Sequence, residues 1–229
     1  AIAIAEDWIQ NQRARRVIVL GADDVTNPSL LEWIGAGFLS AGAASTAKRV
    51  EDAALPFDER RHGLILGMGA VGILLERKAD VVARGHHPIA ELVATSVGNS
   101  AFHGSRLNEA HISASMDTLI NKVCLKQNIS RGELAKQLLF MSHETYTPAR
   151  GGSATAEIKA LRHAFGKDAK HISISNTKGF TGHAMGAGIE DVIAPLALAS
   201  KRIPPIPNLN QPDPGMEDLQ FSTGGNFTG

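Results

Sequence analysis

The sequence contains little of several residue types that mark common protein classes. Among its 229 residues there is one cysteine and one tyrosine, and aromatic residues make up 5%. A single cysteine excludes a disulfide within the chain and fits a reducing compartment, so we expect a cytoplasmic location. No apolar run approaches the length that spans a bilayer, and the first residues lack the pattern of a signal peptide. We therefore expect no transmembrane segment.

Excess charge of either sign is also lacking. The chain has 23 basic and 23 acidic side chains, and 43% of its residues are hydrophobic. Balanced charge gives no electrostatic reason to expect nucleic acid as a partner, and the short basic group Arg13, Arg15 and Arg16 reads as a solvated helix end. The length and apolar content are enough for a core within one or two domains.

The order of the apolar segments predicts a layered α/β protein. The patterns indicate helices near 1–12, 114–126, 131–138, 155–165 and 187–200. Strands are expected near 16–20, 138–141 and 172–175, and two further apolar runs occupy 63–76 and 89–97. A polar loop at 99–106 separates two halves. Pro195 should kink the last helix or reset its start.

Two histidines follow two of the expected strands, and they are the most informative feature of the chain. His143 comes shortly after the run 138–141, and His183 follows 172–175 within a loop rich in glycine. Open α/β sheets keep their chemistry at such strand ends. The alternative is a pair of strand-end histidines that hydrogen-bond the backbone.

The surrounding residues resemble the histidine motifs of the β-ketoacyl synthases, members of the thiolase superfamily. The family's His-Gly-Thr-Gly-Thr stretch is matched by His143, Thr145 and Thr147, and its Lys-x-x-x-Gly-His stretch by Lys178, Gly182 and His183. Glu157 matches the second of two acidic positions that follow the first stretch.

The chain also departs from the family pattern. Ala154 stands at the first acidic position, and Glu144 and Tyr146 replace both glycines of the first stretch. Gly151-Gly152-Ser153 reads as a short insertion.

The resemblance implies a thiolase-like layered αβαβα fold that is incomplete in this chain. Residues 1–98 would be the C-terminal part of the first thiolase-like half, and 99–229 most of the second half, short of its closing glycine-rich loop. In the family, a nucleophilic cysteine precedes an alanine-rich helix that resembles residues 1–9. The nucleophile would therefore lie upstream of Ala1, and the chain reads as an internal fragment.

The resemblance further implies a decarboxylative Claisen condensation between an acyl thioester and a malonyl-type extender, in polyketide or fatty-acid biosynthesis. His143 and His183 would donate hydrogen bonds to the developing enolate oxygen. Lys178 would keep both imidazoles neutral, and Glu157 would pair with Lys178 unless it is a solvated helix carboxylate. Thr145 and Thr147 would bind the pantetheine arm, or act as turn formers.

The expected partner is an acyl carrier protein, and the full-length parent would be a homodimer. No cofactor or metal is expected, because the substrates arrive on phosphopantetheine. Two alternatives remain open: a non-condensing decarboxylase or chain-length-factor-like subunit, and a non-catalytic dimerisation scaffold.

Three other patterns are weaker. Residues 67–72 match the dinucleotide-binding motif Gly-x-Gly-x-x-Gly, but the sequence lacks the strand before it and the capped helix after it that such a site needs. In the resemblance to the β-ketoacyl synthases, these glycines instead let a neighbouring backbone segment approach closely. Cys124 lies on an apolar helical face, which favours a buried packing thiol. The remaining histidines lack metal-ligand spacing or any recognisable motif: His62, His86, His87, His103, His111, His163 and His171.

Overall fold

The computed structural model describes residues 1–102, 106–148 and 152–227. The helices in these residues are α1 (Ile2–Gln10), α2 (Pro28–Ser40), α3 (Lys78–Ala83), α4 (Glu109–Gln127), α5 (Arg131–Gln137), α6 (Gly152–Phe165), α7 (Lys178–Thr181) and α8 (Ile189–Ser200). The strands are β1 (Arg16–Asp24), β2 (Met68–Glu76), β3 (Leu139–Met141), β4 (Ser173–Ser175), β5 (Arg202–Ile203), β6 (Gln220–Phe221) and β7 (Gly225–Asn226). Two 3₁₀ turns are η1 (Val50–Asp52) and η3 (Gly166–His171).

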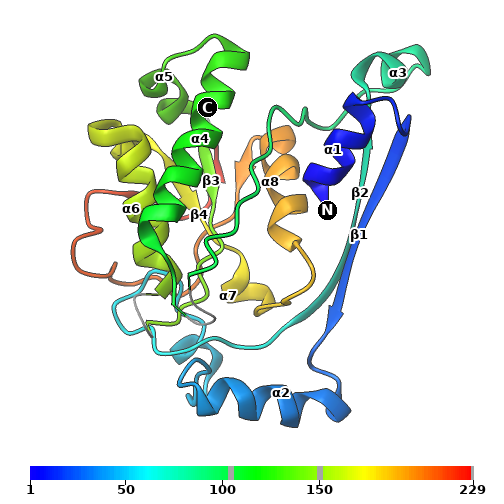
Figure 1. Ribbon diagram of the computed structural model, residues 1–229. Helices are drawn as coiled ribbons and strands as arrows, with labels where there is room; N and C mark the ends of the chain where they lie inside the picture. Colours follow the sequence, from blue (N-terminus) through cyan, green and yellow to red (C-terminus); the bar gives the residue numbers. More distant parts are fainter. Residues whose placement is uncertain (103–105, 149–151, 228–229) are drawn as a thin grey trace.

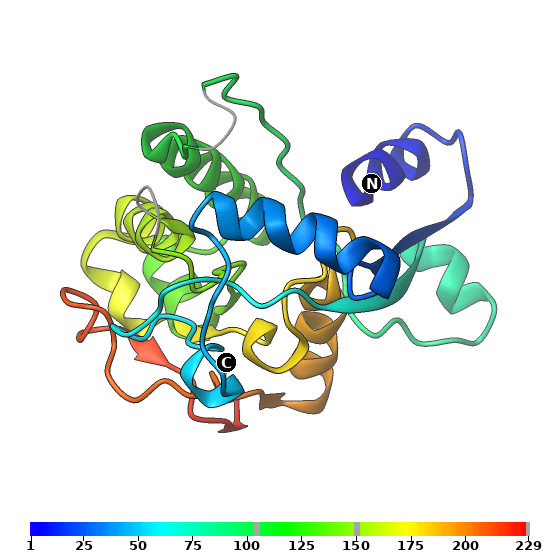
Figure 2. The ribbon, with the colours of Figure 1, turned by 90° about the horizontal axis from the view of Figure 1, so that it is seen from below.

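The N-terminal half is built on a long two-stranded ribbon. β1 pairs antiparallel with β2, from Arg16 opposite Glu76 to Asp24 opposite Met68. Figure 1 shows this ribbon at one side of the molecule, with α1 and α3 at its upper end and α2 below its lower end. Seen from below, α2 runs across the face of the molecule (Figure 2). One face of the ribbon exposes apolar side chains, among them Leu20, which is 76% exposed, whereas the side chains of the other face are partly buried.

The C-terminal half contains a parallel sheet in the order β3-β4-β6. Helices α4 and α6 pack against each other beside it, and the main core cluster includes Ile120 of α4, Ile158 and Leu161 of α6, and Ile174 of β4. α8 contacts both β3 and β2, so it lies between the parallel sheet and the ribbon (Figure 1). Strands and helices thus alternate in layers, as the sequence predicts.

Local signals explain where the main helices begin. The Asn108 side chain caps α4 by accepting a hydrogen bond from His111 N, and Ser130 and Glu133 form a reciprocal capping box at α5. In α2, Asn27 caps the helix and Pro28 occupies its first turn. Pro195 lies inside α8, which continues from Ile189 to Ser200 without a new start.

The predicted helices and strands are found, with shifted ends. α4 begins at Glu109 rather than near 114, and β1 continues to Asp24. The apolar run 89–97 forms neither a helix nor a strand. The polar loop at 99–106 includes His103, and the short insertion at 151–153 includes Gly151; both residues lie outside the described residues.

The glycine motif at 67–72 does not open a helix. Met68 starts β2, which runs antiparallel to β1, so the strand–turn–helix unit of a dinucleotide site is not formed there. Gly67 instead permits a close approach, because a Cβ at this position would lie 2.2 Å from Thr181 O.

Cys124 is partly buried and packs against the main core cluster, in agreement with a packing role. In the part of the chain that the structure covers, no helix is long and apolar enough to cross a membrane. The same residues contain no group of three His, Cys, Asp or Glu side chains with the geometry of a metal site.

Candidate active site

The first histidine lies where the central strands of the parallel sheet end. Ser142 N donates to Ser175 O at 2.8 Å, which extends the pairing of β3 with β4 by one rung. His143 follows directly, and its side chain leaves the sheet at the carboxyl edge of the strands. Parallel strands end at the same edge, so the residues after β4 reach the same place.

Asn176 joins the two strand ends. Its Nδ2 donates to Glu144 O at 2.8 Å and to Ser142 O at 3.3 Å, and its Oδ1 accepts from Lys178 N at 2.9 Å. Asn176 is fully buried, so these hydrogen bonds have no competing water. One amide therefore fixes the His143 loop relative to the loop of Lys178.

The second histidine is held by a segment from the N-terminal half. His183 N donates to Ile65 O at 2.8 Å, and Gly67 N donates to His183 O at 3.1 Å, which makes a parallel bridge to Leu66. Gly182 precedes it with a φ of +68°, a conformation that favours glycine. The glycines at 67 and 182 thus let two backbones meet where a side chain would separate them.

The structure brings the two imidazoles together. The ring centroids of His143 and His183 are 5.4 Å apart, and the ring planes meet at 82°, edge to face. Both rings line a hollow of about 190 Å³ with Lys178, Met141 and Glu190. A larger hollow of about 510 Å³ lies against the ribbon and α1 and does not include either histidine. The histidine pair, and with it the candidate site, belongs to the smaller hollow.

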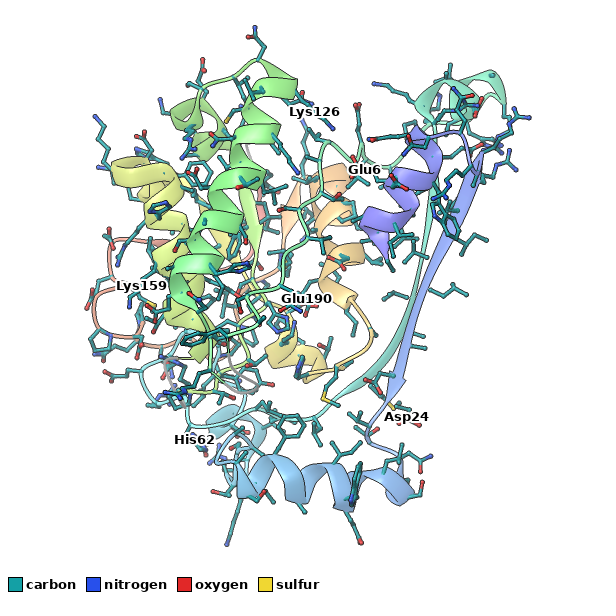
Figure 3. All side chains as sticks on the ribbon, in the orientation of Figure 1. Glu6, Asp24, His62, Lys126, Lys159 and Glu190 are labelled. Atoms are coloured by element: carbon teal, nitrogen blue, oxygen red, sulfur yellow. The ribbon has the colours of Figure 1, made fainter. Side chains whose placement is uncertain are left out.

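The expected pairing of Lys178 with Glu157 is wrong. Lys178 Nζ lies 2.6 Å from Glu190 Oε1, and both side chains are largely buried. Glu190 is in the first turn of α8, close to α7, as its label in Figure 3 shows. The carboxylate of Glu157 is already occupied by other donors, which is the physical reason for the different pairing.

Glu157 instead supports the backbone of the first histidine. Ser142 Oγ donates to Glu157 Oε2 at 2.5 Å, and His143 N donates to Glu157 Oε1 at 3.0 Å. Burial raises the pKa of Glu157 to about 7, against the opposing effect of these hydrogen bonds and of Lys178. The alternative that Glu157 is a solvated carboxylate on the helix surface is therefore wrong.

The surroundings keep both imidazoles neutral. The pKa of His143 is lowered from 6.5 to about 4, first because surrounding protein replaces water around the ring and then because Lys178 and His183 add positive charge. As a whole residue, His143 is nonetheless exposed. The pKa of His183 is lowered by the same two main causes, burial and Lys178. Near neutral pH each ring then carries one N–H donor.

Thr145 and Thr147 lie in the loop after His143. Thr147 Oγ1 donates to Ala43 O at 3.1 Å or to Thr145 O at 3.2 Å, which is the behaviour of a turn former. Thr145 N donates to Ser153 Oγ at 3.1 Å. Both threonines are half-buried.

The residues that replace the family's glycines are fully buried. Burial raises the pKa of Glu144 to about 8; its Oε2 accepts from Tyr146 N, and its Oε1 lies 3.7 Å from Arg61 Nε. Tyr146 has a φ of +46°, which is uncommon for a bulky residue. Its hydroxyl lies 3.4 Å from both Ile65 N and Lys178 O. Tyr146 therefore contacts the segments that carry Lys178 and support His183.

Three residues of the site were not identified from the sequence: Ser142, Asn176 and Glu190. Asn176 and Ser142 could have been identified only by their position, because each lies next to the end of a predicted strand. Glu190 follows the glycines after His183 and begins a predicted helix, a position where an acidic side chain also has a purely local explanation.

Comparisons with known proteins point to one family. Residues 140–210 match the family model described as "Beta-ketoacyl synthase, C-terminal domain". The chain is 32% identical over 229 residues to a 3-oxoacyl-[acyl-carrier-protein] synthase 2 from Synechocystis, covering 98% of this chain and 51% of that protein. It is 32% identical over 192 residues to a Staphylococcus aureus protein of the same name, covering 78% of this chain and 43% of that protein.

A solved structure of similar shape is a ketosynthase bound to the hexaketide, in complex with its type II polyketide synthase acyl-carrier protein. It has a TM-score of 0.83 and 25% identity, with 99% of this chain and 54% of that chain covered. Another solved structure of similar shape is a β-ketoacyl synthase from Burkholderia phymatum, with 24% identity and a TM-score of 0.79. The match covers 96% of this chain and 50% of that chain, and it supports the fold alone. The chain spans about half the length of the curated relatives that it matches.

Proposed function

We propose that this chain, which belongs to the β-ketoacyl synthase family of the thiolase superfamily, supplies the decarboxylation half-site of a condensing enzyme that extends acyl chains in fatty-acid or polyketide synthesis. The observation that carries the proposal is the edge-to-face pair of His143 and His183, with ring centroids 5.4 Å apart beside Lys178. Paired neutral donors of this kind stabilise a developing oxyanion.

In the proposed reaction, a malonyl-type thioester binds in the hollow between the histidines. The bond between its α-carbon and its carboxylate breaks, CO₂ leaves, and the electron pair forms an enolate whose oxygen accepts N–H hydrogen bonds from both rings. His183 Nδ1 is buried and has no partner among the described residues, so Nε2 is the nitrogen that can reach the substrate. The enolate carbon then attacks the acyl thioester, and the thiolate that held the acyl group leaves.

Lys178 acts on the histidines rather than on the substrate. Its charge disfavours the imidazolium form of both rings, and a protonated ring would have no nitrogen left for a proton released later in the cycle. Glu190 holds the ammonium in place through its 2.6 Å ion pair. Glu157 has a different part, since it supports the backbone of His143.

The substrates of this proposal arrive on the phosphopantetheine arm of an acyl carrier protein. The solved relative in complex with its acyl-carrier protein supports this choice of partner. Thr145 and Thr147 are the candidate contacts for the arm, with Thr145 the better one because the Thr147 hydroxyl already has backbone acceptors. The cycle needs no resident cofactor or metal.

The full-length protein in this proposal is a homodimer of the cytoplasm, with 1–98 completing one thiolase-like half and 99–229 forming most of the other. The acyl group is held by a cysteine outside this chain. A chain-length-factor-like subunit or decarboxylase would have another residue there. A pure scaffold has no physical need for His143, Lys178 and His183 in one hollow.

The proposal is tested by incubating the full-length protein with an acyl thioester and measuring its intact mass and peptide masses. A covalent acyl adduct on a cysteine upstream of this chain, followed by a β-keto product on addition of malonyl-acyl carrier protein, is the expected result. No adduct together with CO₂ release would indicate a decarboxylase. If neither an acyl adduct nor CO₂ release is observed, an enzymatic role is contradicted.

A further inference from the structure

Ser142 is an unusual residue at the end of β3, because all of its polar atoms are used and none faces the hollow. Its N–H donates to Ser175 O at 2.8 Å, and its carbonyl accepts from Asn176 Nδ2 at 3.3 Å. Its hydroxyl donates to Glu157 Oε2 at 2.5 Å and accepts from Glu144 N at 2.8 Å. The side chain is fully buried, so water cannot replace these partners.

The hydroxyl is one of two donors that orient the Glu157 carboxylate. The other is the backbone N–H of His143, at 3.0 Å from the second carboxylate oxygen. Ala154, one turn earlier on α6 and fully buried, contributes no polar side chain to this group. A hydrogen bond to a charged and buried acceptor is stronger than one between neutral groups.

We propose that Ser142 is a positioning residue for His143, which it holds beside His183 by orienting the buried carboxylate of Glu157. This inference rests on the proposed function for its kinetic consequence, but its structural consequence can be measured without activity. Ser142 does not touch the substrate in this account.

The electrostatic surroundings give the arrangement a measurable signature. Lys178 of α7 and Glu190 of α8 act on Glu157 with opposite signs, and Glu144 and His143 lie in the loop that Ser142 begins. On the outer side of α6, Lys159 pairs with Glu109 of α4, and His163 lies near Asp117 of α4. Among the groups acting on Glu157, the Ser142 hydrogen bond lowers its pKa. Loss of the hydroxyl should therefore raise the pKa of Glu157.

The test compares Ser142→Ala with Ser175→Ala in the full-length protein. Ser175 is a matched control, because it is also a fully buried serine at a strand end, but its Oγ donates to Pro204 O at 2.8 Å and not to the Glu157 group. We expect Ser142→Ala to lower kcat for malonyl decarboxylation about tenfold with little change in KM, and to move the acid limb of the rate profile to higher pH. Ser175→Ala should leave that pH profile where it is.

A double-mutant cycle with Glu157→Gln separates positioning from general damage. If Ser142 acts through Glu157, the effect of Ser142→Ala should largely disappear in the Glu157→Gln background. Additive effects of the two substitutions would overturn the proposal.

NMR titration of the Glu157 carboxyl carbon and of the His143 ring provides the readout that needs no activity. The proposal is contradicted if Ser142→Ala leaves both titrations unchanged. Should that variant not fold, Glu157→Gln carries the same test through the His143 ring signals, and unchanged signals would again contradict it. A wild-type protein that does not decarboxylate malonyl thioesters would refute the proposed function, while the titrations would still decide the role of Ser142.

Discussion

His183 meets His143 edge to face because a segment from the other half of the chain holds it there. Its backbone pairs with Leu66, and its ring plane lies at 82° to that of His143. The two rings come from loops after different strands, and neither loop alone determines their separation. The geometry of the pair therefore depends on how the two halves dock.

This dependence predicts the effect of a single methyl group at Gly67. A Cβ there would lie 2.2 Å from Thr181 O, so Gly67→Ala must push the two backbones apart and move His183. We expect at least a tenfold loss of decarboxylation in the full-length protein, together with a lower melting temperature. Gly35→Ala is the matched control, since an added Cβ there meets nothing within 4 Å on helix α2. Equal activity of both variants would contradict the role of the Leu66 bridge.

Replacing the buried ammonium predicts a change in the titration of the histidines. In Lys178→Met, the pKa of His143 should rise from about 4 toward its ordinary value, and the pKa of His183 should rise with it. The rate of the complete condensation cycle, which needs an unprotonated ring nitrogen to take up a proton, should then fall at mildly acidic pH, where imidazolium forms. NMR titration of the ring protons measures both values. Lys159→Met, which removes an exposed lysine paired with Glu109, is the control and should shift neither histidine.

Lys178→Met should also be less stable than the wild-type protein. Lys178 and Glu190 are 4% and 16% exposed as side chains, so the substitution leaves a largely buried carboxylate without its partner. Breaking a buried pair in this way costs about 3 to 5 kcal/mol. A free energy of unfolding equal to that of the wild type would show that Glu190 finds other partners.

Two buried carboxyl groups predict that stability falls as the pH rises from their ordinary pKa of 4.5 to about 8. Burial raises the pKa of Glu144 to about 8 and that of Glu157 to about 7, both above the ordinary 4.5. Such groups contribute stability that is fully present below pH 4.5 and is lost as the pH rises through 7 and 8, because the unfolded chain releases these protons more easily.

The measurement is the free energy of unfolding between about pH 5 and about pH 9, where the loss should reach roughly 7 kcal/mol, because each unit by which burial raises a pKa contributes about 1.4 kcal/mol. Glu144→Gln should remove part of this dependence. Glu32→Gln, at an exposed position of α2, should not. If the free energy of unfolding of the wild-type protein rises throughout this range, the conclusion that burial destabilises the charged form of both carboxyl groups is contradicted.

Much of this arrangement could be predicted from the sequence because it depends on local patterns. The apolar runs before His143 and before Asn176 indicate two strands, and the polar residues after them indicate a shared edge. The motif resemblance adds Lys178 and His183 to that edge. The structure confirms that His143, Lys178 and His183 line one hollow.

The partners within the site could not be predicted, because they depend on side-chain packing between segments far apart in the sequence. Glu157 lies within α6 and Glu190 in the first turn of α8, and only the fold decides which of them reaches Lys178. The role of Leu66 in holding His183 is likewise a contact between the two halves. Ser142 carries no sequence signal that separates it from an ordinary strand-end serine.

The role of the histidine pair is tested by the release of CO₂ from malonyl-acyl carrier protein, measured with the full-length protein and with its histidine variants. His143→Ala and His183→Ala should each lower the rate by about 10²- to 10³-fold, as loss of an oxyanion donor does. His163→Ala, at an exposed position on α6, should match the wild type. Wild-type rates in either His143→Ala or His183→Ala would contradict the account.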